Sequence, residues 1–163
     1  MSKILLVMRH AKSSWADESQ ADHDRPLNER GLRDAPRMAS LLDDQNSVPD
    51  LILCSTATRA HTTAKIVEQE SSFSGSLLTY KNLYLGKPND YLRLLAQLDD
   101  DVQTAMVVGH NPGLEELIQQ VCGAWERMPT GAIAKIDLKL DRWLTTASVS
   151  SAELLNLWLP KEI

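Results

Sequence analysis

Basic side chains follow three short apolar runs of this sequence, within five residues of the end of each run. Arginine presents a planar fork of N–H donors that matches a phosphate group, and histidine can act as a nucleophile or a proton carrier near neutral pH. Several such side chains brought together would suit the chemistry of an anion. The side chains concerned are Arg9 and His10 after residues 4–8, Arg59 shortly after residues 51–54, and His110 after residues 105–109.

The three apolar runs predict β-strands that are buried on both faces. They contain no polar alternation, as expected for central strands of a parallel sheet. In open α/β sheets, ligands bind beyond the carboxyl ends of the strands, so the three strand ends should meet at one edge. A single histidine or arginine at such a point is more commonly a local or solvated side chain. Three strand ends that each carry basic residues favour an anion site.

Amphipathic patterns between these runs predict helices. Asn28 can cap a helix from Glu29, in which Pro36 predicts either a kink or a second start near Asp34. Asn89 and Pro112 are placed as the cap and the first residue of two later helices. Further strands are expected at residues 77–80, 131–140 and 156–159. The alternation predicts a three-layer α/β/α sandwich whose central sheet is mostly parallel with an antiparallel edge strand.

Length and charge narrow the class of protein. The 163 residues predict one domain over residues 1–163, and the formal net charge of -5 argues against a nucleic-acid partner. Cys54 and Cys122 lie in apolar stretches without partners at metal-ligand spacing, so reduced core residues and no metal site are expected. No stretch suggests a signal peptide or a membrane span, which predicts a cytoplasmic protein without a membrane partner.

Residues 13–26 form a polar stretch without periodicity, which predicts a long loop beside the first strand end. A loop of this length is usually either functional or disordered. Trp15 in this loop could contact a partner or simply pack against the protein. His23 in the loop and His61 in a predicted helix are expected to lie at the surface.

Three motifs in this order and spacing resemble the histidine phosphatase superfamily. They are RHAKS at residues 9–13, STATRAHTTA at residues 55–64 and GHNPG at residues 109–113. The segment from Asp24 to Gly31 and the run from Gly109 to Glu116 are similar to the phosphohistidine phosphatases of the SixA type. The resemblance implies a phosphoglycerate mutase-like fold and a covalent mechanism without a cofactor. It implies that His10 attacks phosphorus, that Arg9, Arg59 and His110 hold the phosphoryl oxygens, and that Arg25 reaches into the pocket from its loop.

The implied roles place different demands on the two histidines. His10 must be neutral to attack, and neighbouring positive charges favour its neutral form. His110 would have to remain cationic or donate a hydrogen bond. Relatives that cleave phosphate esters carry a carboxylic acid, whereas this chain has Asn82 in the region where a glutamate might be expected. This difference favours a good leaving group such as imidazole, although Glu115 and Glu116 remain possible acids.

These observations support one leading hypothesis and three alternatives. The leading hypothesis is a metal-independent phosphatase that removes phosphate from a histidine-phosphorylated protein. The second is a phosphomonoesterase that acts on small phosphate esters, for which an acid from Glu115, Glu116 or residues 16–24 would be required. The third is a phosphate-recognition module without turnover. The fourth, metal-dependent hydrolysis, lacks carboxylates at ligand spacing from the histidines.

Overall fold

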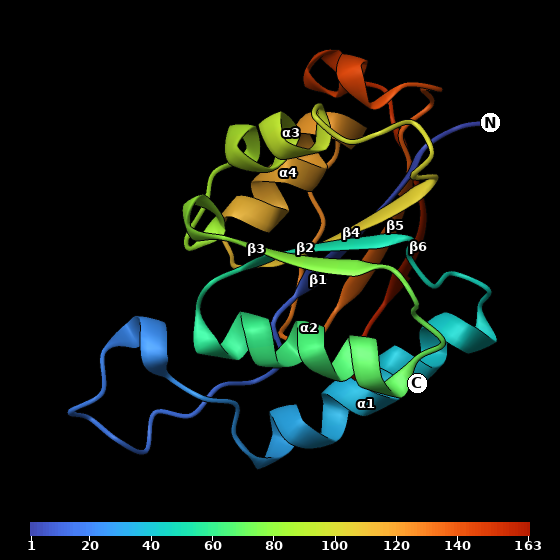
Figure 1. The fold of residues 1–163 in the computed structure, drawn as a ribbon. Helices are drawn as coiled ribbons and strands as arrows, with labels where there is room; N and C mark the ends of the chain where they lie inside the picture. Colours follow the sequence, from blue (N-terminus) through green and yellow to red (C-terminus); the bar gives the residue numbers. More distant parts are fainter.

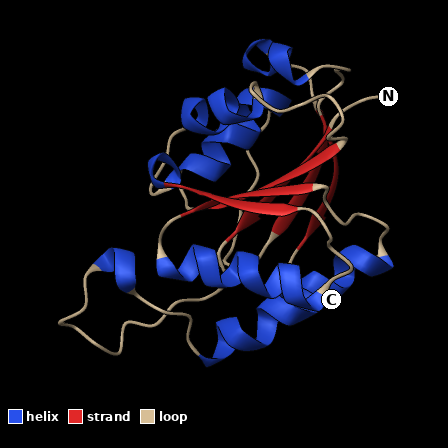
Figure 2. Cartoon of the chain, in the orientation of Figure 1, coloured by secondary structure: helices blue, strands red, loops and turns tan.

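A computed structural model describes residues 1–163, in which one six-stranded sheet lies between two layers of helices (Figures 1 and 2). Helices α3 and α4 cover one face of the sheet, and α1 and α2 cover the other. None of the helices has the length and apolar character required to cross a membrane. The strands are β1 (Ile4–Arg9), β2 (Leu51–Ser55), β3 (Ser76–Tyr80), β4 (Thr104–Gly109), β5 (Ile133–Asp137) and β6 (Glu153–Trp158), and the helices are α1 (Glu29–Asp44), α2 (Thr58–Glu70), α3 (Pro88–Leu95) and α4 (Gly113–Cys122).

The strands are ordered β3-β2-β4-β1-β5-β6 across the sheet. The first four are parallel, whereas β5 is antiparallel to both β1 and β6. The predicted α/β/α sandwich with a mostly parallel sheet is therefore confirmed. The reversed strand is β5, however, which is one position inside the edge. Because its inner neighbour is the buried β1 and its outer neighbour the more exposed β6, the apolar start of residues 131–140 suits this inner position.

The absence of polar alternation in the central strands follows from burial on both faces. Leu5 and Val7 of β1 belong to the core that includes residues of α3 and α4. Leu6 and Met8 belong to the core that includes residues of α1 and α2. Since successive residues of a strand point to opposite faces, both sets must be apolar. Each fully buried side chain of this kind stabilises the fold by roughly 2 kcal/mol.

Helix α1 begins as predicted and continues past Pro36. The Asn28 side chain accepts a hydrogen bond of 2.9 Å from the Gly31 amide. The helix has no second start, because the buried Asp34 does not cap a new turn and instead faces Arg30, Arg33 and Arg37. Pro36 cannot donate to the carbonyl four residues earlier, at Leu32. Leu32 is exposed, so water can satisfy that carbonyl.

The starts of α3 and α4 differ from the predicted ones by one or two residues. Lys87 occupies the cap position of α3, and its amide donates a 2.8 Å hydrogen bond to the Asp90 carboxylate. Asn89 is therefore inside the helix, and its predicted capping role is wrong. Pro88 takes the first helical position, where its missing N–H costs nothing. Pro112 lies one residue before α4, which begins at Gly113.

Gly31 allows α1 to approach the segment that follows β1. A Cβ atom at this position would overlap the backbone carbonyl oxygen of Lys12. That carbonyl also accepts a hydrogen bond of 3.0 Å from the Asn28 amide. Because the obstacle is backbone on both sides, a side-chain rotation cannot relieve it. The close approach fixes the position of the residues immediately after His10.

We expect Gly31→Ala to destabilise the protein, although alanine is the better helix former by about 1 kcal/mol. Overpacking against backbone costs roughly 1–3 kcal/mol and should outweigh this gain. Urea unfolding would measure the change. Ser40→Ala, at an exposed position of the same helix, is the matched control and should be neutral or slightly stabilising. A more stable Gly31→Ala protein would contradict the close packing.

Candidate active site

The carboxyl ends of β2, β4 and β1 are adjacent, and they bring the predicted site residues together. Arg9 is in register with Gly109, and the His10 amide donates to the Gly109 carbonyl at 3.1 Å. The His10 and His110 rings lie 5.3 Å apart between centroids. A pocket of about 170 Å³ forms at this edge. It is lined by Arg9, His10, Lys12, Ser13, Trp15, Arg25, Arg59, Leu85, His110, Asn111 and Thr130, which include all five predicted site residues.

His10 is held as a neutral imidazole with one nitrogen free. Its Nδ1 lies 2.7 Å from the Ala11 carbonyl oxygen. A carbonyl can only accept, so Nδ1 carries the hydrogen and Nε2 keeps its lone pair. Burial is the main reason that the pKa of His10 is lowered to about 4, and Arg59, Arg9 and Arg25 lower it further. The Ala11 amide is itself fixed by Thr63 of α2, at 3.0 Å.

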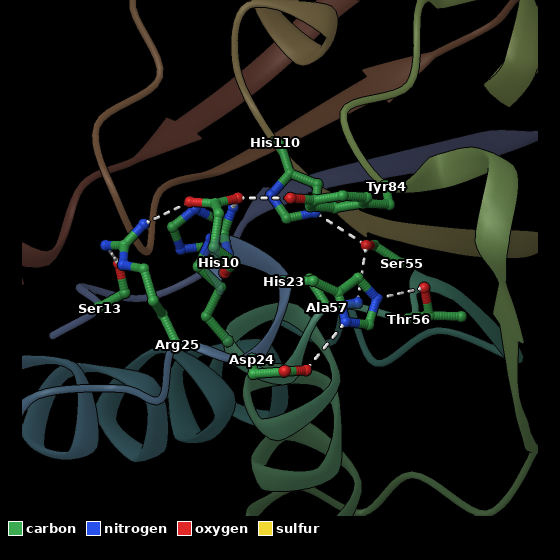
Figure 3. Close-up of polar contacts among 12 residues, drawn as sticks. His10, Ser13, His23, Asp24, Arg25, Ser55, Thr56, Ala57, Tyr84 and His110 are labelled. Carbon is green, nitrogen blue, oxygen red and sulfur yellow. Dashed lines mark hydrogen bonds and ion pairs between the residues drawn. The ribbon is translucent and has the colours of Figure 1, made fainter. Parts of the chain in front are cut away.

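His110 is also neutral, which excludes the predicted cationic form for the site as it stands. Burial is the main reason that its pKa falls to about 3, and the neighbouring His10 and arginines add to the effect. Its Nε2 lies 2.8 Å from the Ser55 hydroxyl, which accepts from the Ala57 amide at 3.1 Å (Figure 3). The fully buried Ser55 hydroxyl must also donate, and Nε2 is its acceptor. Nδ1 of His110 then carries a hydrogen that has no partner in the protein.

Asp22 connects the two buried arginines of the site. Arg59 donates to the Asp22 carbonyl at 2.7 Å and to its carboxylate at 3.0 Å, and Arg25 donates to the same carboxylate at 2.9 Å. Tyr84 donates a third hydrogen bond to this carboxylate, at 2.6 Å. The Tyr84 bond and the two arginines hold the pKa of Asp22 far below its usual value. Asp22 is therefore an anion that orients cations, and it cannot serve as an acid.

The loop over residues 13–26 brings Arg25 to the pocket, the position that the family resemblance implies. Arg25 is 6 % exposed and donates to the Ser14 carbonyl at 3.0 Å and to the Ser13 hydroxyl at 2.5 Å. Trp15 stacks on the Arg25 guanidinium at 3.3 Å, although the indole itself is 70 % exposed. The stacking gives Trp15 an internal contact and leaves its outer face open to solvent.

Arg9 also lines the pocket and has unused donor capacity. One of its terminal nitrogens donates to the Met128 carbonyl at 3.1 Å, while its buried Nε has no partner. Burial lowers the pKa of Arg9, and Arg59 and Arg127 act in the same direction. An arginine nevertheless remains charged near neutral pH. The pocket is thus a concentration of positive charge with free donors.

Sequence reasoning missed the contributions of Asp22, Tyr84 and His23. His23 was expected at the surface, but it is half-buried, with its Nε2 2.9 Å from the Thr56 hydroxyl and its ring against Tyr84 (Figure 3). His61 is exposed, as predicted. Asp22 and His23 lie in an aperiodic loop, where no pattern indicates which side chains turn inward. The distance in sequence from the three motifs does not indicate either that Asp22 and His23 lie near the site.

No carboxyl group lines the pocket. Asn82 is exposed and lies outside the pocket, so the segment after β3 brings no acid to the site. The same segment instead contributes Leu85 to the lining. Glu115 accepts a 2.8 Å hydrogen bond from the Met128 amide, and Glu116 is exposed. Neither glutamate is placed to give a proton to a group bound between the histidines.

Comparison with known proteins assigns the chain to a family. The family model described as the histidine phosphatase superfamily (branch 1) matches residues 5–78. An uncharacterised chloroplastic protein of Arabidopsis thaliana is 32% identical over 152 residues, which are 88% of this chain and 70% of that protein. A candidate phosphohistidine phosphatase SixA from Agrobacterium tumefaciens superimposes with a TM-score of 0.84 at 29% identity, over 98% of this chain and 99% of that one.

The fold extends to more distant proteins. A candidate α-ribazole-5'-P phosphatase from Escherichia coli superimposes with a TM-score of 0.71 at 19% identity, over 98% of both chains. At this identity the likeness concerns the fold alone. The chain belongs to the histidine phosphatase superfamily. Within that superfamily it is of the SixA type, with the phosphoglycerate mutase-like α/β fold.

The buried neutral histidines should make the protein less stable in mild acid. The unfolded chain binds protons at these residues near pH 6.5, whereas the folded protein does so only near pH 4 for His10 and pH 3 for His110. Between these limits the unfolded state holds more protons, so the free energy of unfolding falls as pH falls. Each group should contribute a loss of about 2 kcal/mol between pH 7 and pH 5.

Urea unfolding of wild type and His110→Gln at pH 7 and pH 5 would test this dependence. Glutamine retains a polar side chain without a titrating group, so the fall should be about 2 kcal/mol smaller in the variant. His61→Gln, at an exposed position, is the matched control. Equal falls for wild type and His110→Gln would show that His110 is not held neutral by burial.

Proposed function

We propose that this protein is a metal-independent phosphatase that hydrolyses phosphohistidine on a protein substrate through a phosphoryl intermediate on His10. The main support is the state of His10 in its pocket. Its Nε2 is unprotonated because Nδ1 is bonded to the Ala11 carbonyl, and the surrounding arginines would neutralise a phosphoryl group. The SixA-type fold agrees with this activity.

In the first step, the His10 Nε2 lone pair attacks phosphorus as the bond between phosphorus and the substrate imidazole breaks. The substrate imidazole departs with the bonding electron pair. If its far nitrogen is already protonated, it leaves as neutral imidazole and needs no general acid. A leaving group that needs no general acid suits a pocket that has no carboxyl group in its lining. The charge on the transferred phosphoryl oxygens would be shared by Arg9, Arg59 and Arg25.

His110 contributes a directed hydrogen-bond donor. Its Nδ1 hydrogen is unpartnered and buried, and the Ser55 hydroxyl holds the opposite side of the ring. A phosphoryl oxygen would accept this hydrogen bond. Proximity of the negative phosphoryl group would also raise the proton affinity of His110. The same ring therefore stabilises the transferred group whether it donates as neutral imidazole or becomes cationic.

In the second step, water attacks phosphorus and the bond to His10 Nε2 breaks. The electron pair returns to Nε2, and inorganic phosphate leaves with the hydrogens of the water molecule. His10 is restored as the neutral tautomer, which the Ala11 carbonyl again stabilises. Asp22 remains ionised throughout and keeps Arg59 and Arg25 aligned.

The alternatives are supported less well by the site. A phosphomonoesterase must protonate an alkoxide, but Glu115 is bonded to the Met128 amide, Glu116 is exposed and Asp22 is ionised. A recognition module without turnover does not need a free nucleophilic nitrogen in contact with the anion pocket. The location expected for the protein is the cytoplasm, where histidine-phosphorylated proteins would be its partners.

Turnover should require His10 and should discriminate between leaving groups. With a chelator present, wild type should hydrolyse a phosphohistidine-bearing protein quickly and p-nitrophenyl phosphate slowly, and His10→Ala should hydrolyse neither. Release of inorganic phosphate would be measured, and His61→Ala is the matched control at an exposed histidine. Rapid ester hydrolysis would indicate a metabolite phosphatase with another acid, and no turnover of either substrate would favour the recognition module.

Arg59→Ala should lower kcat/KM for phosphohistidine roughly 100-fold. Loss of one preorganised donor to a transition-state oxygen costs about 3 kcal/mol. Arg93→Ala, which removes an exposed arginine of α3, should leave the rate unchanged and serves as the control. Circular dichroism would confirm folding, since Arg59 also anchors Asp22. A folded Arg59→Ala protein with wild-type turnover would contradict the proposed phosphoryl clamp.

A further inference from the structure

A second and larger cavity adjoins the catalytic pocket and is strongly basic. It has a volume of about 400 Å³ and shares Arg9, Lys12 and Thr130 with the pocket. This basic groove has a single acidic residue in its lining, Glu162. The groove is lined by Arg9, Lys12, Arg30, Arg127, Pro129, Thr130, Leu159, Pro160, Lys161 and Glu162.

The concentration of positive charge at the groove contrasts with the charge of the whole chain. The chain carries 17 basic and 22 acidic residues, with a formal net charge of -5. Seven of the basic residues but only one acidic residue line the groove and the catalytic pocket together. If charged residues were distributed at random over the surface, more acidic residues would line these two cavities. The local potential is therefore positive in an otherwise acidic protein.

Most of this charge is not compensated within the molecule. Lys12, Arg127 and Lys161 form no ion pair. Arg30 lies 3.5 Å from the Asp34 carboxylate, but Arg33 and Arg37 share that one negative charge. The cations at the groove therefore remain available to a bound anion.

The groove is assembled from four separate parts of the chain. Lys12 follows β1, Arg30 is on the first turn of α1, and Arg127 comes from the segment after α4. Lys161 belongs to a short 3₁₀ turn, Pro160–Glu162, that contacts α1. Arg9 forms a wall common to both cavities, so a ligand in the groove would lie directly beside a phosphoryl group held by His10.

We infer that the basic groove binds an acidic surface beside the phosphohistidine of a protein substrate, so that this phosphatase selects phosphohistidines with aspartate or glutamate neighbours. The inference rests on the proposed function and specifies its substrate. The groove lining supplies only one leucine and two prolines as apolar surface and no aromatic ring. That lining is poor for the rings of a nucleotide or coenzyme but suits carboxylates. Exposed lysine and arginine side chains also favour charge steering towards a protein partner.

Two phosphohistidine peptides of equal length would test the inference. One carries aspartate and glutamate beside the histidine, and the other carries asparagine and glutamine. In low salt, wild type should show a kcat/KM roughly tenfold higher for the acidic peptide, in line with electrostatic steering. The preference should fall towards one in 0.5 M salt because screening shortens the range of the attraction. Equal rates for the two peptides in low salt would overturn the inference.

Charge reversal would locate the effect. Arg127→Glu with Lys161→Glu should abolish the preference, whereas Arg93→Glu with Arg142→Glu makes the same change of net charge away from the groove and should keep it. All four positions are exposed, so folding should be retained. A preference that survives the first double substitution would overturn the inference. The inference would also be overturned if this variant hydrolysed both peptides at wild-type rates and lost only activity on a small bisphosphate, such as fructose 1,6-bisphosphate.

Two further measurements separate this inference from the proposed function. Failure of wild type to hydrolyse free phosphohistidine and either peptide would refute the proposed function. Groove binding would then be judged by fluorescence anisotropy, with the dye-labelled acidic peptide and the His10→Ala protein. Salt-sensitive binding that Arg127→Glu with Lys161→Glu removes would support the acidic partner, and binding unaffected by that change would reject it.

Discussion

Mutual repulsion between buried cations is the constraint on which this site depends. Arg59 and Arg25 are almost fully buried, and Arg9 is half-buried beside them. A single carboxylate, Asp22, offsets part of this charge and fixes the direction of two of the guanidinium groups. Arg9 forms no direct ion pair, and only Glu115 partly offsets its charge. Burial is the larger reason that protonation of the two histidines is unfavourable, and the positive charge of the arginines adds to it. The same charge makes a doubly charged phosphoryl group the natural complement of the pocket.

The sheet supplies the rigidity that such a charge distribution requires. The parallel strands β2, β4 and β1 are neighbours, so residues distant in sequence meet at their carboxyl ends. Two local contacts fix the segment after β1. The Thr63 hydroxyl accepts a hydrogen bond from the Ala11 amide, and the absence of a Cβ at Gly31 lets α1 pack directly against the Lys12 backbone. Gly109 has a similar role, since a Cβ there would overlap the Tyr91 hydroxyl. Positioning of the imidazoles thus arises mainly from backbone geometry.

The apolar strands made the architecture predictable, together with the meeting of Arg9, His10, Arg59 and His110, whereas Arg25 was expected only from the family resemblance. Apolar runs buried on both faces could be identified locally, and the ends of parallel strands had to converge. The Asn89 cap failed because α3 starts two residues earlier, with Lys87 at the cap position and Pro88 at the first helical position; the Asp90 carboxylate accepts from the Lys87 amide. The hydrogen bonds that join Asp22 to Tyr84 and Arg59 could not be predicted, because a loop has no periodicity that reveals which side chains point inward. The position of Asn82 was equally hard to predict: it lies exposed in the 3₁₀ turn Lys81–Leu83, and Leu85 lines the pocket instead.

The loop that carries Asp22 and Arg25 is closed at its base by an antiparallel bridge between Ser13 and Leu27. Its ends are also joined by a hydrogen bond of 2.8 Å from the Ser14 amide to the Pro26 carbonyl. Because closure of a flexible loop becomes costlier only slowly with length, residues can be added or removed at its exposed tip at small cost. The bridge would shield Arg9 and His10 from such changes. Descendants of one ancestral chain could therefore diversify what they recognise while inheriting the phosphoryl-transfer centre intact.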